Sequence, residues 1–281
     1  METTQCGSSI ANPDDSCLSS SKNLSASVVM SATLRPVDFY AEMFGFEPER
    51  SIAAAYDSPF PPDNRLVLVV PDVSTEYRKR DRDKAAIAAH VEAVIEAVPG
   101  NVAVFFSSFA LRDMIASEMG LVGRPVIFQE RNMEEGDRAR VLQTLQRGEG
   151  HVLLGVLGGI FSEGIDLPGS GLLAAVIVGP ALPAVGMERK LMSAWFQDKH
   201  GHGFRYAYQV PGMARVVQAA GRVIRSSDDV GAIVLVGRRF LQRDYQAFFP
   251  PDWVAERSQD PADRLAAFWP AKAVTSESSG S

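Results

Sequence analysis

From residue 65 onward, uninterrupted apolar runs alternate with segments whose apolar residues recur at helical spacing. The runs are RLVLVV, NVAVFF, RPVIF, HVLLGV, LLAAVIV and GAIVLV. A continuous run, as opposed to an alternating one, is typical of a strand buried on both faces of a sheet. The helical segments end at glycine or proline stops: Ile87–Val98 before Pro99, Val141–Leu145 before Gly148, and Met187–Trp195 before Gly201. This alternation predicts an α/β domain with a mainly parallel sheet flanked by helices, and ligands bind such sheets at loops beyond the carboxyl ends of the strands.

The amino-terminal part of the chain has a different organisation. Residues 1–23 form a polar leader that we expect to be disordered. In residues 24–60, ASVVMSATLRPVDFYAEMFGF predicts a short apolar strand, a Ser-Ala-Thr turn and a helix broken near Gly45, and the Pro-rich SIAAAYDSPFPPDNR is typical of a linker. A larger unit follows over residues 61–270. Residues 271–281 are predicted to form a disordered tail.

Composition adds limits to this picture. With 281 residues and 46% hydrophobic content, the chain can bury a substantial core. Its formal net charge of -6 gives no overall attraction to nucleic acid, so any such contact has to be local. The two cysteines, Cys6 and Cys17, match neither a CxxC site nor a disulfide framework, which favours a cytoplasmic location. No apolar run approaches the roughly 18 to 20 residues of a membrane span, and the leader is no secretory signal.

One candidate site lies in QAAGRVIRSSDDVGAIVLVG. On a helix, the spacing of Gln218, Arg222 and Arg225 places all three side chains on one face. Two guanidiniums on one face suit a phosphate, because the planar fork of arginine matches its oxygens. The alternative is that they pair with Asp228, Asp229 or other surface acids. The segment alone leaves both possibilities open.

A second candidate is the loop LGGIFSEGIDLPGSG, which follows a predicted strand. Its glycines would allow the backbone to cradle an anion. Glu163 or Asp166 could accept a hydrogen bond from a ribose hydroxyl or orient an arginine. The alternative is that the glycines serve turn geometry only.

Four segments together resemble one family. VVMSATL, NVAVFFSSFALRDMI, VLLGVLGGIFSEGIDLPG and VVQAAGRVIRSSDDVGAIVLVGRRF are similar, in this order, to motifs III, IV, V and VI of the DinG/XPD-type superfamily 2 DNA helicases. The resemblance implies a three-layer RecA-like (P-loop NTPase-like) fold and identifies residues 61–270 as the carboxyl-terminal motor lobe. Residues 24–60 would then be the end of the first lobe and a linker.

The resemblance also implies residue roles. Gln218, Arg222 and Arg225 would act at the γ-phosphate of ATP, with one arginine as the arginine finger. The nucleotide cleft would be lined by Glu163, Gly164 and Asp166.

Contacts to single-stranded DNA are implied in the same way. Ser107 and Ser108 would touch the DNA backbone. Ser31 and Thr33 would couple the state of the hydrolysis site to strand separation.

The chain departs from the family in what it lacks. It contains no G-x-x-x-x-G-K-[ST] loop and no Asp-Glu-Ala-His box, so ATP with Mg²⁺ would be held mainly by a missing amino-terminal lobe. The family's iron–sulfur cluster needs four cysteines and cannot be built in this chain. Gly237 stands where the family often has an acidic residue. We therefore expect a half-motor, either a fragment or a split-gene product, that is inactive as an ATPase or helicase by itself.

A basic segment and two histidines are open to more than one interpretation. YRKRDRDK, residues 77–84, could meet nucleic-acid phosphates and a base, but its interleaved acids favour a solvated helix start. His200 and His202 lack further donors at metal-binding spacing, so no metal site is predicted.

The alternative function is a non-catalytic nucleic-acid or partner-binding module with a helicase-lobe fold. A generic doubly wound nucleotide-binding domain is disfavoured because no G-x-G-x-x-G opens a helix after a strand.

Overall fold

The computed structural model describes residues 25–31, 33–120, 123–162 and 171–278, so the predicted leader lies outside the described residues. The chain divides into two compact units, residues 1–56 and 57–281. In the first unit, helix α2 (Val37–Met43) ends before Gly45, which has a φ of 69°, and the 3-10 turn η1 (Pro48–Arg50) follows. The strand predicted around Val28 is wrong, because no described segment of this unit offers it a backbone partner. Val28 is instead 81% exposed.

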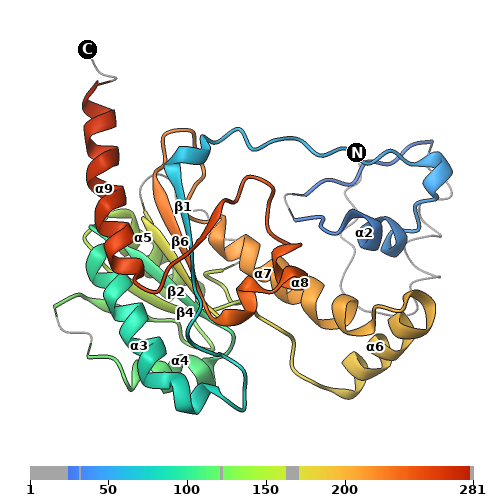
Figure 1. Cartoon of the computed structure of the whole chain (residues 1–281), viewed down its shortest axis with the longest axis horizontal. Coiled ribbons are helices and arrows are strands. Elements are labelled where there is room, and N and C mark those ends of the chain that lie inside the picture. Colours follow the sequence, from blue (N-terminus) through green and yellow to red (C-terminus); the bar gives the residue numbers. More distant parts are fainter. Residues whose placement is uncertain (1–24, 32, 121–122, 163–170, 279–281) are drawn as a thin grey trace. The chain divides into compact units, whose positions relative to one another are not determined.

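Within the described residues of the second unit, seven parallel strands form one sheet in the order β3-β4-β2-β5-β6-β1-β7 (Figure 1). All six predicted strands are confirmed, and β7 was missed because its sequence, Ala-Glu-Arg, contains no apolar run. The strands are β1 (Arg65–Val70), β2 (Val102–Phe106), β3 (Val126–Phe128), β4 (Val152–Val156), β5 (Ala174–Val178), β6 (Gly231–Val236) and β7 (Ala255–Arg257).

Helices cover both faces of this sheet (Figure 1). Helices α3, α4 and α9 share one hydrophobic core with the side of β5 that carries Val176, and α7 packs against β5 as well. Ala175 points to the opposite face, where it contacts Val223 and Ile224 just beyond α7. The helices are α3 (Arg80–Ala97), α4 (Phe109–Ala116), α5 (Glu135–Gln146), α6 (Met187–His200), α7 (Val210–Ala220), α8 (Arg243–Gln246) and α9 (Pro261–Ser278), with shorter turns η2 (Pro62–Asn64), η3 (Arg205–Gln209) and η4 (Arg238–Leu241).

Helices α6 and α9 each differ in one respect from what the sequence predicts. Helix α6 forms where it was predicted, but its apolar residues Met187 and Leu191 are 73% and 64% exposed. Helix α9 extends to Ser278, into the segment predicted to be a tail.

The strands are buried on both faces, as their continuous apolar pattern predicts. Val104 and Phe105 point to opposite faces of β2, and both are fully buried. Burying a side chain of this size contributes about 1.5 to 3 kcal/mol. Polar chemistry is therefore confined to the two ends of the strands.

At the amino ends of the strands, Asn101 joins three segments. Its amide nitrogen donates to the carbonyl oxygens of Leu145 at 2.5 Å and Gly171 at 2.9 Å, and its amide oxygen accepts from the backbone N–H of His151 at 2.7 Å. The side chain is fully buried. Asn101 thus ties the end of α5 and the starts of β4 and β5 to β2.

Arg124 has a comparable role beside it. Its guanidinium donates to the backbone carbonyls of Ile95, Val98, Gly100 and Gly150. Burial lowers the pKa of this guanidinium. Arg124 therefore satisfies carbonyls at the end of α3 that have no partner within the helix.

We expect Asn101→Ala to lower the free energy of unfolding by about 2 to 4 kcal/mol, because it leaves buried backbone groups without a hydrogen-bond partner. Urea denaturation followed by circular dichroism measures the loss. The exposed Asn132→Ala is the matched control and should change the stability by less than about 0.5 kcal/mol. Equal stability of the two variants would contradict the assigned role of Asn101.

Candidate functional site

The three residues expected on one helix face do not share a helix. Helix α7 ends at Ala220, so only Gln218 is helical, and its side chain is exposed. Arg222 and Arg225 lie in the turn that follows and are half-buried. The prediction that one helix carries all three is wrong.

Asp229 gives the physical reason for this early end. Its carboxylate accepts hydrogen bonds from the backbone N–H groups of Arg225 and Ser226, each at 2.8 Å. Such local capture of backbone donors by an Asp side chain competes with helix formation. Val223 and Ile224 are meanwhile buried against the sheet.

The turn that carries Arg225 lies near the amino end of a strand. The side-chain amide of Asn64, just before the amino end of β1, donates to the carbonyl of Ser227 at 3.0 Å. The segment that carries Arg225 therefore lies toward the amino end of β1, and not beyond the carboxyl ends of the strands.

Arg222 connects this segment to the loop after β4. Its Nε donates to the carbonyl oxygen of Ser162 at 3.4 Å. The structure thus brings together the two candidate segments that the sequence singles out. Glu163, Gly164 and Asp166 follow Ser162 and lie outside the described residues.

Two glycines of this loop make room for neighbouring side chains. Gly158 has a φ of +75°, and a Cβ there would lie 3.0 Å from Nε of Arg215. A Cβ on Gly159 would lie only 2.4 Å from Nε2 of Gln129. For these two positions, turn geometry and packing account for the glycines.

Gln129 is a site residue that the sequence pattern does not reveal. It follows β3 and is 3% exposed; its Oε1 accepts from the backbone N–H of Val156 at 3.1 Å. Its own carbonyl accepts a hydrogen bond from Arg112 on α4. Gln129 therefore fixes the carboxyl end of β4, where the glycine-rich loop starts. A polar residue after a short apolar run resembles an ordinary loop residue, so no sequence signal marks it.

The predicted DNA-contacting serines lie between β2 and α4. Ser108 is the N-cap of α4, and its Oγ accepts from the N–H of Leu111 at 3.2 Å. Ser107 is half-buried at the end of β2. In the first unit, the hydroxyl oxygens of Ser31 and Thr33 lie 3.2 Å apart.

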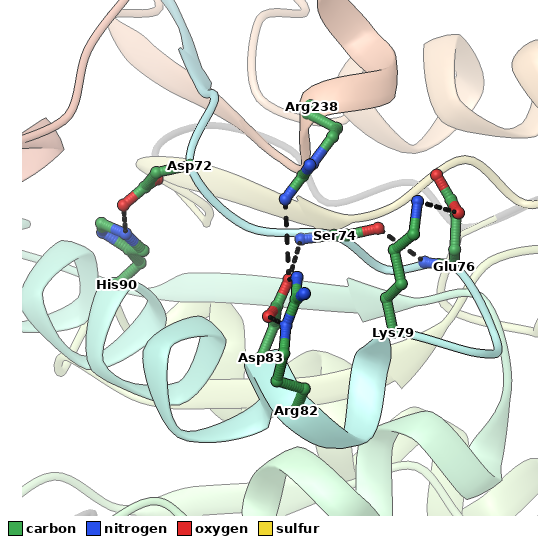
Figure 2. Close-up of polar contacts among 8 residues, drawn as sticks. All are labelled: Asp72, Ser74, Glu76, Lys79, Arg82, Asp83, His90 and Arg238. Atoms are coloured by element: carbon green, nitrogen blue, oxygen red, sulfur yellow. Dashed lines mark hydrogen bonds and ion pairs between the residues drawn. The ribbon is translucent and has the colours of Figure 1, made fainter.

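A charged cluster joins the loop after β1 to the loop after β6, as Figure 2 shows. Oδ2 of Asp83 accepts from the N–H of Ser74 at 2.8 Å, and its Oδ1 lies 2.6 Å from Nε of Arg82. Arg238 approaches the same carboxylate from the β6 side, with Nη2 at 3.8 Å. The hydrogen bond from Arg82 is the main cause that lowers the pKa of the Asp83 carboxyl, and the Ser74 N–H and Arg238 add to it against the effect of burial.

Among the described residues, no group of three or more His, Cys, Asp or Glu side chains is placed to hold a metal ion. None of the helices searched in the described part of the chain is long and apolar enough to cross a membrane.

Comparison with known proteins decides the family. The family model for the helicase C-terminal domain matches residues 91–257, which is more than half of the chain. The chain belongs to the helicase C-terminal domain family. It is 27% identical over 233 residues to the ATP-dependent DNA helicase DinG of Photobacterium profundum, covering 78% of this chain and 32% of that protein.

Other relatives give the same result. A probable ATP-dependent helicase of Methanocaldococcus jannaschii is 29% identical over 202 residues, with 66% of this chain and 30% of that protein covered. The XPD helicase subunit of the general transcription and DNA repair factor IIH of Dictyostelium discoideum is 27% identical over 258 residues, with 83% and 32% covered. The chain therefore spans about a third of the length of these relatives.

Solved structures confirm the RecA-like fold of this helicase domain. A structure titled XPD helicase matches with a TM-score of 0.63 at 19% identity, over 82% of this chain and 42% of that one. The structure of Xpd4 from S. tokodaii matches with a TM-score of 0.62 at 18% identity, over 86% and 46%.

We expect Asp83→Asn to lower the Tm by about 2 to 4 °C at pH 7, because it removes the charge that Arg82 and Arg238 share. The folded pKa of Asp83 lies below its unfolded value of about 3.9. The stabilisation is therefore fully present above the unfolded pKa and is lost as the pH falls through the folded pKa. Thermal melts between pH 7 and pH 2 should show the two proteins converging in acid.

Asp81→Asn is the control for this measurement, because Asp81 lies on the same first turn of α3 but its side chain is 82% exposed. It should change the Tm by less. A Tm difference for Asp83→Asn that stays constant down to pH 2 would contradict the ion-pair explanation.

Proposed function

We propose that this chain works as the carboxyl-terminal motor lobe of an ATP-dependent DNA helicase. It would complete ATP hydrolysis in trans to an amino-terminal lobe and grip single-stranded DNA. Family membership supports this proposal, as does the coverage of only a third of each relative. The observation that carries it is the hydrogen bond from Arg222 to Ser162, which joins the arginine segment to the glycine-rich loop.

In this proposal, the arginines supply positive charge to a nucleotide held by the other lobe. Arg225 would be the arginine finger, with Arg222 beside it, because the planar fork of a guanidinium matches the oxygens of a phosphoryl group. Positive charge aimed at the transferring phosphoryl group stabilises the transition state. Gln218, exposed on the last turn of α7, would orient the attacking water. Glu163, Gly164 and Asp166 would line the cleft.

The residues of this chain do not by themselves fit Mg²⁺ and ATP. The sequence has no phosphate-cradling G-x-x-x-x-G-K-[ST] loop, and the described residues offer no metal-holding group. The chemistry of metal and phosphate binding would therefore come from the amino-terminal lobe. The contribution of this chain would be the cations and the positioning of water.

DNA would be gripped at the carboxyl end of β2. Ser107 is half-buried there and is the better placed of the two serines to meet a phosphate, because the hydroxyl of Ser108 already caps α4. Ser31 and Thr33 would couple hydrolysis to strand separation.

We expect DNA-stimulated ATP hydrolysis to appear when the chain is mixed with an amino-terminal lobe of a DinG/XPD-type helicase, and Arg225→Ala to reduce it by about 10³-fold or more. A coupled phosphate-release assay measures the rate. The exposed Arg243→Ala on α8 removes an equal charge elsewhere and should retain the activity.

Restored hydrolysis that is indifferent to both Arg222 and Arg225 would overturn this mechanism. If no amino-terminal lobe restores hydrolysis while the chain still binds single strands, the result favours the alternative, a non-catalytic nucleic-acid or partner-binding module.

A further inference from the structure

The segment YRKRDRDK, residues 77–84, spans the end of the loop after β1 and the start of α3, and nearby acidic side chains neutralise part of its charge. Nζ of Lys79 lies 2.8 Å from Glu76, and Nζ of Lys84 lies 2.9 Å from Glu118. The hydrogen bond from Lys79 lowers the pKa of Glu76, so this carboxylate is charged at neutral pH. In these two ion pairs, acidic neighbours neutralise Lys79 and Lys84, as is typical of a solvated helix start.

Arg238 adds a further positive charge beside this segment. Arg82 and Arg238 approach the single carboxylate of Asp83 from two different elements, α3 and η4 (Figure 2). One carboxylate neutralises only one guanidinium, so a positive charge is left over. Within the described residues, Arg78 and Arg80 form no ion pair. The resulting surface, here named the basic corner and formed by residues 77–82 and Arg238, is locally positive on a chain of net charge -6.

Tyr77 projects from the basic corner. Its side chain is 80% exposed, so it contributes little to the hydrophobic core. The guanidinium carbon of Arg80 lies 4.4 Å from the centroid of the Tyr77 ring, which is within the range of a cation–π contact. An exposed aromatic ring among cations is the combination by which proteins bind single-stranded nucleic acid, through base stacking and phosphate contacts.

We propose that the basic corner binds single-stranded DNA, with a base stacked on the ring of Tyr77 and backbone phosphates against Arg78 and Arg238. The inference rests on the proposed function, since it extends the DNA grip beyond Ser107. Both places lie at the carboxyl end of the same parallel sheet, because β1 and β2 run in one direction. The order β2-β5-β6-β1 separates them by three strand spacings, about 14 Å. One DNA strand lying along this edge would contact both.

Binding of the full chain to a fluorescent oligothymidylate, measured by anisotropy, tests the stacking contact. We expect Tyr77→Leu to weaken binding about 5- to 100-fold and Tyr77→Phe, which keeps the ring, to retain it. Because Tyr77 is exposed, both variants should melt at the temperature of the unaltered chain. An abasic oligonucleotide should bind the unaltered chain more weakly by a similar factor. The Tyr77→Leu variant should bind the two oligonucleotides equally.

Salt dependence tests the phosphate contact. We expect Arg78→Gln to reduce the slope of log affinity against log salt concentration by about 0.7. Lys84→Gln is the matched control, since it removes the same charge from the same segment but at a residue already paired with Glu118. Its effect on the slope should be smaller.

Equal affinities of Tyr77→Leu and Tyr77→Phe, or no binding by the unaltered chain, would overturn the inference. The proposed function fails separately. Hydrolysis rescued in trans through Arg225, together with binding indifferent to Tyr77, would remove this inference and leave the proposed function intact. The reverse result would support the basic corner and remove the proposed catalytic role.

Discussion

Every side chain of β2 is fully buried, and the nearby strands β4, β5 and β6 are buried along their whole length. A sheet covered on both faces leaves no room in its middle for charged groups, because burying an unpaired charge costs several kcal/mol. Charged and polar side chains are therefore displaced to the strand ends. The candidate sites of this helicase domain therefore lie beyond the ends of the strands.

The polar side chains at the two ends of the sheet differ in what they contact. At the amino ends, Asn101 and Arg124 use their polar atoms to satisfy buried backbone groups, so they stabilise the fold and have little capacity left for a ligand. Near the carboxyl ends, Asp83 is shared by two guanidiniums and Tyr77 stands exposed. The surplus positive charge at the carboxyl end of the sheet is suited to binding an external anion. The proposed arginine finger lies apart from this edge, in a turn that Asp229 shapes.

Much of the fold could be predicted from the sequence because the relevant signals are local. Continuous apolar runs indicated the first six strands, and the spacing of Ile87 and Val91 indicated α3. The end of α7 was missed because the spacing of Gln218 and Arg222 fits a helix equally well, while the competing side chain, Asp229, acts through backbone hydrogen bonds that have no periodicity. The exposure of Met187 on α6 was missed because a helical period does not reveal which face the fold covers.

The candidate site was predictable in its parts and not in its arrangement. The sequence by itself determined the α/β class, the order of the motifs and the residue types available for chemistry, since these depend on neighbours along the chain. Only the tertiary structure decided that Arg238 meets Asp83, that Gln129 lies against Gly159 and that Arg222 reaches Ser162. These contacts join segments far apart in sequence, and they depend on the order and register of strands in the sheet. Long-range strand order arises from packing of the whole core, which no local pattern of residues encodes.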